Sequence, residues 1–322
     1  MMCRKLFLVP ILIALLLAGC GKREPTKPSK LIFAVDVHTM AAAPVFVADA
    51  KGFWKQENLD VEIKPFASGR LALDALVGKV ADAATVADVP VVFAAFQQQK
   101  VRIITVFSNS EKHVNMLARK DRGVLKAQDL RGKKIAVSSG TNAEFFMDML
   151  LERYEIDRKD VTIISLNPPD TVAAIIRGDV DVIFAWQPHI ANARKQLGDN
   201  AVVLSSEGIY NQPFMVVVME DYLTIGKEEL QKLINGLKKA EEFMRVNKEE
   251  SIDIVAKRIE IDARDVASIW DDYSFKVGLS PSMADSLEKE GQWAKKAGIV
   301  APEAKEPDYR LLVYKGFLTS PN

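Results

Sequence analysis

The sequence predicts an α/β protein of two lobes, in which each lobe is a mixed or parallel β-sheet flanked by helices. Two observations predict this class. Short β-prone runs alternate with helical runs, as is typical of parallel strands joined by crossover helices, and this alternation breaks off and restarts at residue 133. The chain has 322 residues, and single hydrophobic cores stop growing near about 250 to 300 residues.

The first set of alternating runs begins after residue 30. Apolar runs such as LIFAVDV predict strands, and the runs between them space their apolar residues as helices do. The expected strands are 31–37, 60–66, 82–86 and 101–107, and the expected helices are 44–54, 70–78 and 88–99.

The second set predicts strands at 133–139, 161–166 and 180–186 and helices at 142–154, 171–177 and 188–197. Residues 75–83 and 174–182 share one pattern, in which a helix end and a glycine lead through an aspartate into a buried strand. This echo favours one βαβ module used twice.

Two further β-prone runs, residues 113–121 and 213–221, fall where the alternation breaks, and we interpret them as hinge strands. Lobe 1 is then expected to comprise residues 31–117 and 215–322, and lobe 2 residues 118–214. Amphipathic helices at 230–244 and 251–259 are expected to pack on lobe 1, although a separate helical domain is an alternative.

The first thirty residues have the layout of a secretory signal followed by a tether. A basic pair at residues 4–5 precedes an apolar run, 6–17, that is too short to span a bilayer comfortably. Residues 17–20 resemble the bacterial lipoprotein signal, in which the cysteine carries lipid, so we expect a signal peptide over 1–19 and lipidation of Cys20. The alternative is an ordinary membrane anchor with an incidental cysteine. Residues 20–30 are polar and interrupted by proline, and we interpret them as a lipid-anchored tether.

Composition narrows the function further. The only other cysteine, Cys3, lies inside the expected signal, so a lipidated mature chain has no disulfide and no cysteine nucleophile. Basic and acidic residues balance at 43 each, which gives no indication of nucleic-acid binding.

Several stretches, taken in order, resemble one protein family. Residues 44–48, 51–54 and 59–63 are similar to the opening of periplasmic binding proteins of ABC importers for nitrate, sulfonate, taurine and thiamine pyrimidine. Residues 129–137, 140–141 and 185–188 resemble second-lobe landmarks of that family, and the resemblance covers residues 31–304.

The resemblance implies a class II periplasmic-binding-protein fold whose two lobes close on a small solute. It implies a monomeric, non-enzymatic receptor without a cofactor that passes the solute to an ABC permease in the cytoplasmic membrane. With lipid on Cys20, such a protein would be held at a membrane in the cell envelope and face the periplasm or the exterior. We expect the solute to be anionic, with a sulfonate- or carboxylate-like group.

Candidate ligand contacts follow the strands, because ligands of open parallel sheets sit at the carboxyl ends of strands, where helix N-termini favour anions. Plain helix capping or core packing is the alternative at each of these positions. The candidates from these junctions are Gly69, Arg70, Thr85, Asp88, Ser139, Gly140, Thr141, Asn142 and Trp186.

The resemblance adds His38 and Met40 after the first strand, and Asn109 and Asn211 are weaker candidates beside the breaks in the alternation. Gln187 stands where much of the family has glutamate. This departure puts in doubt a ligand whose ammonium group would pair with that carboxylate.

Catalytic motifs are not evident. The three histidines are far apart in the sequence without metal-ligand spacing, and no G-x-S-x-G elbow is present. Two alternatives stay open: an enzyme of the same fold, in thiamine-pyrimidine or quinone-precursor synthesis, and a receptor module for a membrane sensor. The cysteine-rich motif of the related eukaryotic pyrimidine synthases is absent.

Overall fold

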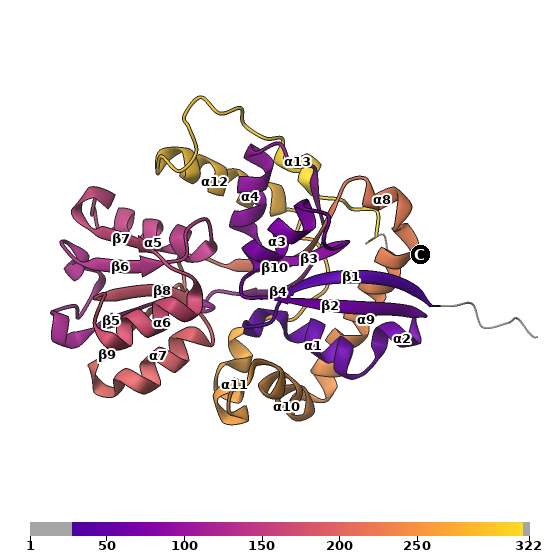
Figure 1. The fold of residues 1–322 in the computed structure, drawn as a ribbon, viewed down its shortest axis with the longest axis horizontal. Helices are drawn as coiled ribbons and strands as arrows, with labels where there is room; N and C mark the ends of the chain where they lie inside the picture. The colour runs from indigo at the N-terminus through magenta and orange to yellow at the C-terminus, as the bar shows by residue number, and fades with distance from the viewer. Residues whose placement is uncertain (1–27, 318–322) are drawn as a thin grey trace, which may run out of the picture.

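A computed structural model describes residues 28–317, which form two α/β lobes lying side by side (Figure 1). Each lobe contains one five-stranded sheet with helices on its faces. The expected α/β fold of two lobes is therefore confirmed. The expected signal peptide, Cys20 and most of the tether lie outside the described residues.

The sheet of the first lobe has the strand order β2-β1-β3-β10-β4. Its strands are β1 (Ser29–Asp36), β2 (Leu59–Phe66), β3 (Ala83–Ala87), β4 (Val101–Ser110) and β10 (Gln212–Met219). Its crossover helices are α1 (Ala43–Ala50), α2 (Phe53–Gln56), α3 (Gly69–Val77) and α4 (Asp88–Phe96). The single helix expected over 44–54 is divided at Gly52, whose φ of +63° belongs to the left-handed region that glycine adopts readily.

The sheet of the second lobe has the order β7-β6-β8-β5-β9. Its strands are β5 (Val114–Arg119), β6 (Lys134–Val137), β7 (Thr162–Ser165), β8 (Val182–Trp186) and β9 (Ala201–Ser205). Its helices are α5 (Asn142–Arg153), α6 (Pro168–Arg177) and α7 (His189–Leu197). Short 3-10 turns lie at Met40–Ala42, Lys120–Arg122, Ala127–Leu130, Arg158–Asp160, Gly198–Asn200 and Trp270–Asp272.

The two lobes repeat one module in detail. Asp82 Oδ2 accepts the backbone N–H of Ile32 at 2.8 Å in the first lobe, and Asp181 Oδ2 accepts that of Lys134 at 2.9 Å in the second. Asp82, just before β3, is thus bonded to β1, and Asp181, just before β8, is bonded to β6 in the same way. The echo seen in the sequence is a real structural repeat.

The two expected hinge strands are embedded in the sheets. β5 pairs antiparallel with β8 and β9, and β10 pairs antiparallel with β3 and β4. The chain therefore crosses between the sheets in the short segments 111–113 and 206–211, and β5 belongs with the second sheet, although we expected lobe 1 to extend to residue 117. Both strands are apolar because each lies inside a sheet that is covered on both faces.

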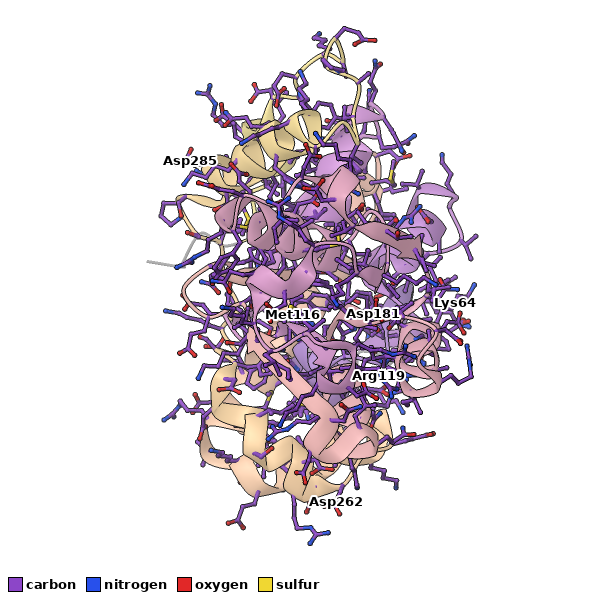
Figure 2. All side chains as sticks on the ribbon, turned by 90° about the vertical axis from the view of Figure 1, so that its left-hand side faces the viewer. Lys64, Met116, Arg119, Asp181, Asp262 and Asp285 are labelled. Carbon is purple, nitrogen blue, oxygen red and sulfur yellow. The ribbon has the colours of Figure 1, made fainter. Side chains whose placement is uncertain are left out.

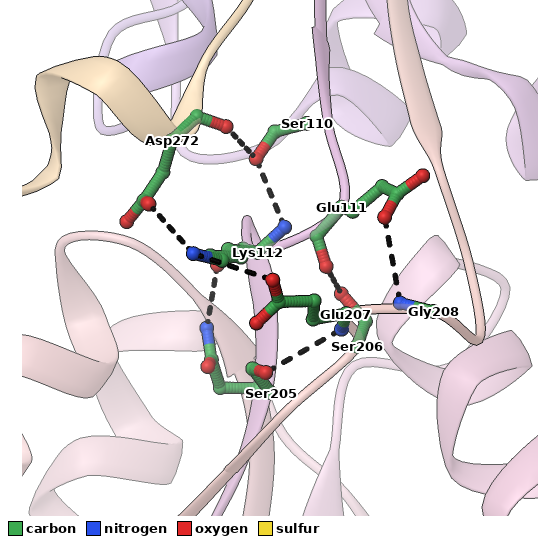
Figure 3. A network of polar contacts seen from close by, with 9 residues as sticks. Ser110, Glu111, Lys112, Ser205, Ser206, Glu207, Gly208 and Asp272 are labelled. Atoms are coloured by element: carbon green, nitrogen blue, oxygen red, sulfur yellow. Dashed lines mark hydrogen bonds and ion pairs between the residues drawn. The ribbon is translucent and has the colours of Figure 1, made fainter.

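The two crossing segments are bonded to each other (Figure 3). Ser206 Oγ donates to the carbonyl of Glu111 at 2.6 Å, and Lys112 Nζ lies 3.5 Å from Glu207 Oε1. The same lysine lies 3.3 Å from Asp272 Oδ1, so the C-terminal part of the chain is attached to this point.

The C-terminal region forms α8 (Tyr222–Ile225), α9 (Lys227–Val246), α10 (Lys248–Ile259), α11 (Ala263–Ile269), α12 (Met283–Lys296) and α13 (Tyr309–Leu312). As expected, α9 and α10 pack on the first lobe, where they share a core with α1 and β1. Asp262, before α11, and Asp285, in α12, mark opposite ends of the molecule in Figure 2.

Helix α12 departs from the expectation that the whole C-terminal region packs on the first lobe. It packs against α4, but Trp293 also contacts the ring of Phe145 in α5, with ring centroids 4.8 Å apart. Lys296 Nζ, in α12, pairs with Glu152 Oε1, in α5, at 2.5 Å. Helix α12 therefore connects the two lobes.

Candidate ligand-binding cleft

A small polar pocket lies between the lobes at the carboxyl ends of their strands. We call it the central pocket, and its volume is about 10 Å³, close to the minimum for one water molecule. It is lined by Asp36, Ser68, Gly69, Arg70, Ala87, Pro90, His113, Thr141, Asn142, Trp186, Gln212 and Phe214. Of the residues expected from the sequence, it brings together Gly69, Arg70, Thr141, Asn142 and Trp186.

The wall formed by the first lobe is the start of α3. Ser68 caps this helix, because its Oγ accepts the N–H of Leu71 at 3.3 Å. Gly69 lies so close to β3 that a Cβ added there would be 3.0 Å from the Cα of Val86. A glycine is therefore needed to seat the helix start at the end of the sheet.

The wall formed by the second lobe is the start of α5. Thr141 caps this helix, accepting the N–H of Ala143 at 3.2 Å, and its hydroxyl donates to the carbonyl of Ser138 at 2.7 Å. Asn142 Nδ2 donates to Gln212 Oε1 in β10. This amide pair joins the two lobes inside the pocket.

The aromatic side of the pocket consists of Trp186 and two histidines. Trp186 stacks against His113, with ring centroids 6.5 Å apart, and meets His189 edge to face at 5.9 Å. Burial lowers the pKa of His113 to about 3 and that of His189 to about 4, so both rings are neutral at pH 7. His113 Nδ1 lies 2.6 Å from the hydroxyl of Tyr273.

Trp186 Nε1 is a buried donor that finds no acceptor among residues 28–317. The sequence anticipated the tryptophan but not its neighbours, because the three histidines come from distant parts of the chain.

In the described part of the chain, no group of three or more His, Cys, Asp or Glu residues is arranged to hold a metal ion.

Asp36 is one of the pocket residues that sequence reasoning missed. It is the last residue of β1, is 2% exposed, and lies where the chain turns toward the cleft. Burial raises the pKa of its carboxyl to about 7, opposed by the backbone N–H groups of His38 and Gly69. The acidic residue near the end of the otherwise apolar run LIFAVDV was the signal that could have found it.

Two larger hollows adjoin the central pocket. One, of about 200 Å³, is rich in hydroxyl groups and is called here the hydroxyl hollow. Its lining includes Ser68, Arg70, Ser138, Ser139, Thr141, Ser165 and Asn167. The other, of about 630 Å³, opens on the far side of Arg70 and is lined in part by Ser139, Gly140 and Glu144.

The remaining expected residues line none of these three hollows. Met40 lies fully buried in the core of the first lobe, because the chain turns inward directly after β1, and Thr85 is buried with its Oγ1 accepting the N–H of Asp36 at 3.0 Å. His38 and Asn211 are exposed, and the backbone of Asn109 bonds to that of Ser274.

Gln187 and Asp88 turn away from the central pocket. Gln187 Oε1 accepts the N–H of Ala191 at 3.2 Å and so stabilises the start of α7. Asp88 is fully buried and accepts the hydroxyl of Tyr210, which lies in the second crossing segment. Glu290 of α12 lies beside Asp88, and burial is the main reason that the pKa of each carboxyl is raised.

The fold is that of a two-lobed binding protein of class II, and the candidate ligand site lies between the lobes. A family model described as NMT1/THI5 like matches residues 39–251, so the chain belongs to the NMT1/THI5-like family.

Several similar proteins are named for sulfonates. The taurine-binding periplasmic protein of Escherichia coli is 28% identical over 170 residues, which is 52% of each chain. A Bacillus subtilis protein named for aliphatic sulfonates is 22% identical over 83% of this chain and 82% of its own. The solved alkanesulfonate-binding protein SsuA from Xanthomonas axonopodis pv. citri, bound to MOPS, has a TM-score of 0.79 at 18% identity, covering 91% of this chain and 100% of that one.

Proposed function

We propose that this protein is the solute-binding component of an ABC importer and that it captures a small solute with a sulfonate- or carboxylate-like group between its lobes. The observation that carries the proposal is the cleft itself: residues of both lobes meet there at the carboxyl ends of the strands, in a chain of this family. The relatives named for taurine and sulfonates support this class of solute.

The anionic group fits the hydroxyl hollow best. Arg70 is the cation of its lining, which also contains Asp170. Ser139 contributes a hydroxyl group, whereas the hydroxyls of Ser138 and Thr141 donate to backbone carbonyls. The starts of α3 and α5 also face this region, and helix N-termini favour anions.

Solute binding must be coupled to movement of the lobes. The central pocket has room for about one water, so a solute that reaches it requires the Asn142–Gln212 pair between the lobes to separate. The two short crossing segments are the parts of the chain that would bend.

The cellular setting is part of the proposal. Lipid on Cys20 holds the protein at a membrane, outside the cytoplasm, and residues 20–30 connect this anchor to the folded lobes. The protein is a monomer and releases the solute without converting it chemically. None of the helices within residues 28–317 combines the length and the hydropathy needed to cross a bilayer.

Thermal unfolding with a panel of solutes tests the function. At a concentration 100 times its dissociation constant, a solute that binds only the folded state adds about 2.7 kcal/mol to the free energy of unfolding. We expect sulfonates or carboxylates to raise the melting temperature. If no member of either class does so, even after the protein has been unfolded and refolded to release a retained ligand, the proposed solute class is wrong. Conversion of the solute to a product, detected by mass spectrometry, would instead indicate an enzyme.

A further inference from the structure

We propose that Asp36 selects the solute, and that the solute is a short zwitterion whose protonated nitrogen binds this carboxylate while its anionic group occupies the hydroxyl hollow. The inference rests on the proposed function and narrows its solute class. It begins from the position of Asp36 in the lining of the central pocket.

Asp36 is a buried carboxylate that lacks a cationic partner. His38 donates its backbone N–H to Oδ1 at 3.0 Å, and the N–H of Gly69 also faces the carboxylate. No lysine or arginine of the described residues pairs with it. An ionised carboxylate offers about four acceptor positions, so two N–H donors leave acceptor capacity for a ligand.

The nearest cation is directed elsewhere. Arg70 lines the same pocket, but its Nη1 donates to the carbonyl of Ser139 across the cleft at 2.8 Å. Gln187 Oε1 accepts the N–H of Ala191 in α7, and this residue does not line the pocket. Among the residues that line the central pocket, Asp36 is the acidic one.

The two binding regions share part of their lining. Ser68 lines both the central pocket and the hydroxyl hollow, while the next residue, Gly69, directs its N–H to Asp36. The solutes chosen for the test join their two charges by two methylene groups. The hydroxyl hollow, at about 200 Å³, suits a molecule of this size.

Calorimetric titration of the purified chain, residues 28–322, tests the inference with four compounds. 2-Aminoethanesulfonate and β-alanine carry both charges, ethanesulfonate carries the anion alone, and ethylamine carries the cation alone. We expect the two zwitterions, or the sulfonate zwitterion alone, to bind roughly 10- to 100-fold more tightly than either single-charge compound, because charge-assisted hydrogen bonds are strong.

The variant Asp36→Asn keeps the size of the side chain and removes its charge. It should bind the zwitterion roughly tenfold or more weakly and leave ethanesulfonate affinity within about threefold of wild type. Asp60→Asn, which removes an exposed carboxylate from β2, serves as the matched control and should change neither affinity. If ethanesulfonate binds as tightly as the zwitterions and Asp36→Asn changes nothing, the inference is overturned while the proposed function stands.

The pH dependence of wild type provides the same test without a variant that could misfold. Between pH 8.5 and 5.5, protonation of Asp36 should weaken the zwitterion by roughly tenfold or more and should not weaken ethanesulfonate. A protonated Asp36 that instead donates to the anion would strengthen both at low pH and overturn the inference.

The other titratable groups near Asp36 do not account for the expected difference in pH dependence between the zwitterion and ethanesulfonate. His113 stays neutral over this range, and Arg70 donates to the carbonyl of Ser139. Asp88 bonds to Tyr210, and Lys64 on β2 reaches the carbonyl of Val80. A parallel titration of His38→Gln removes the exposed imidazole next to Asp36 and should give the same difference between the two compounds. If none of the four compounds binds, this inference is overturned, whereas the proposed solute class is decided by the thermal-unfolding panel.

Discussion

Arg70 of the first lobe donates from Nη1 to the backbone carbonyl of Ser139 in the second lobe, with the two atoms 2.8 Å apart. Its guanidinium also lies over Gly140, where an added Cβ would be 3.5 Å from Arg70 Nε. One side chain thus spans the mouth of the cleft and separates the hydroxyl hollow from the larger hollow beyond it. This contact can form only when the lobes are together.

Replacing Arg70 should therefore favour opening of the lobes. Arg70→Ala removes one exposed interlobe hydrogen bond, worth about 0.5 to 1.5 kcal/mol, and should weaken binding of an anionic solute about threefold to tenfold. Small-angle scattering should show a larger radius of gyration without solute, and calorimetry gives the affinity. Arg153→Ala, an exposed arginine within α5, is the control; equal effects of both variants would refute the role of Arg70.

Gly69→Ala should disturb the cleft through the backbone. The new Cβ would lie 3.0 Å from Val86 Cα and 3.3 Å from the carbonyl oxygen of Thr85, so α3 must shift away from β3. We expect a loss of about 1 to 3 kcal/mol in the free energy of unfolding, measured in urea, and weaker solute binding. Gly278→Ala is the control, because nothing lies within 4 Å of its added Cβ; a Gly69→Ala protein as stable as this control would contradict the prediction.

The buried carboxyls of Asp88 and Glu290 predict how stability changes with pH. Both pKa values are raised in the folded protein, so the unfolded chain loses these protons first as the pH rises. Their effect is therefore to lower stability as the pH rises from about 4.5 toward neutrality.

Glu290→Gln should remove part of that slope. Relative to wild type, the variant should gain stability at pH 7 more than at pH 4.5, as measured by urea unfolding at both values. Glu288→Gln, an exposed position on α12, is the control and should retain the wild-type slope. The opposite change, in which the variant gains more at low pH, would show that the glutamate is ionised in the folded protein.

Trp293 should hold α12 to the second lobe through both its ring and its donor. Its Nε1 donates to Asp148 Oδ2 at 3.1 Å, and its ring packs on Phe145. Trp293→Phe should cost about 1 to 3 kcal/mol, because the buried carboxylate loses a donor.

Trp293→Ala should cost more than Trp293→Phe, about 3 to 5 kcal/mol, because a cavity is left. Thermal or urea unfolding measures both variants, and Trp270→Phe, in the core of the first lobe, is the control for losing an indole. If hydrogen exchange shows no loss of protection in α5 of Trp293→Ala, the helix does not connect the lobes.

Lipidation is tested separately from the cleft. Labelled fatty acid should enter the wild-type protein and Cys3→Ala in a bacterial host, and should not enter Cys20→Ala. Labelling that persists in Cys20→Ala would refute the proposed anchor, and the interpretation of the cleft would not change.

The alternation of strands and helices determined the two-lobed α/β architecture, because period and propensity are local properties that a sequence displays directly. The repeated turn was also readable, since Asp82 and Asp181 stand at matching places in it and make matching bonds. The serine-glycine pairs before two helices likewise indicated Gly69 and Thr141 as candidates for the cleft.

Only the tertiary structure decided which distant groups meet. In the sequence, Asp36 looks like an ordinary residue at the end of a strand, and only its burial in the folded protein raises its pKa. His113 and His189 come from different parts of the chain and both contact Trp186. Met40 and Asp88 were both candidates for the cleft, but packing places Met40 in the core and Asp88 against Tyr210 and Glu290. Burial and long-range contact depend on how the lobes fold and pack, so local patterns in the sequence could not reveal them.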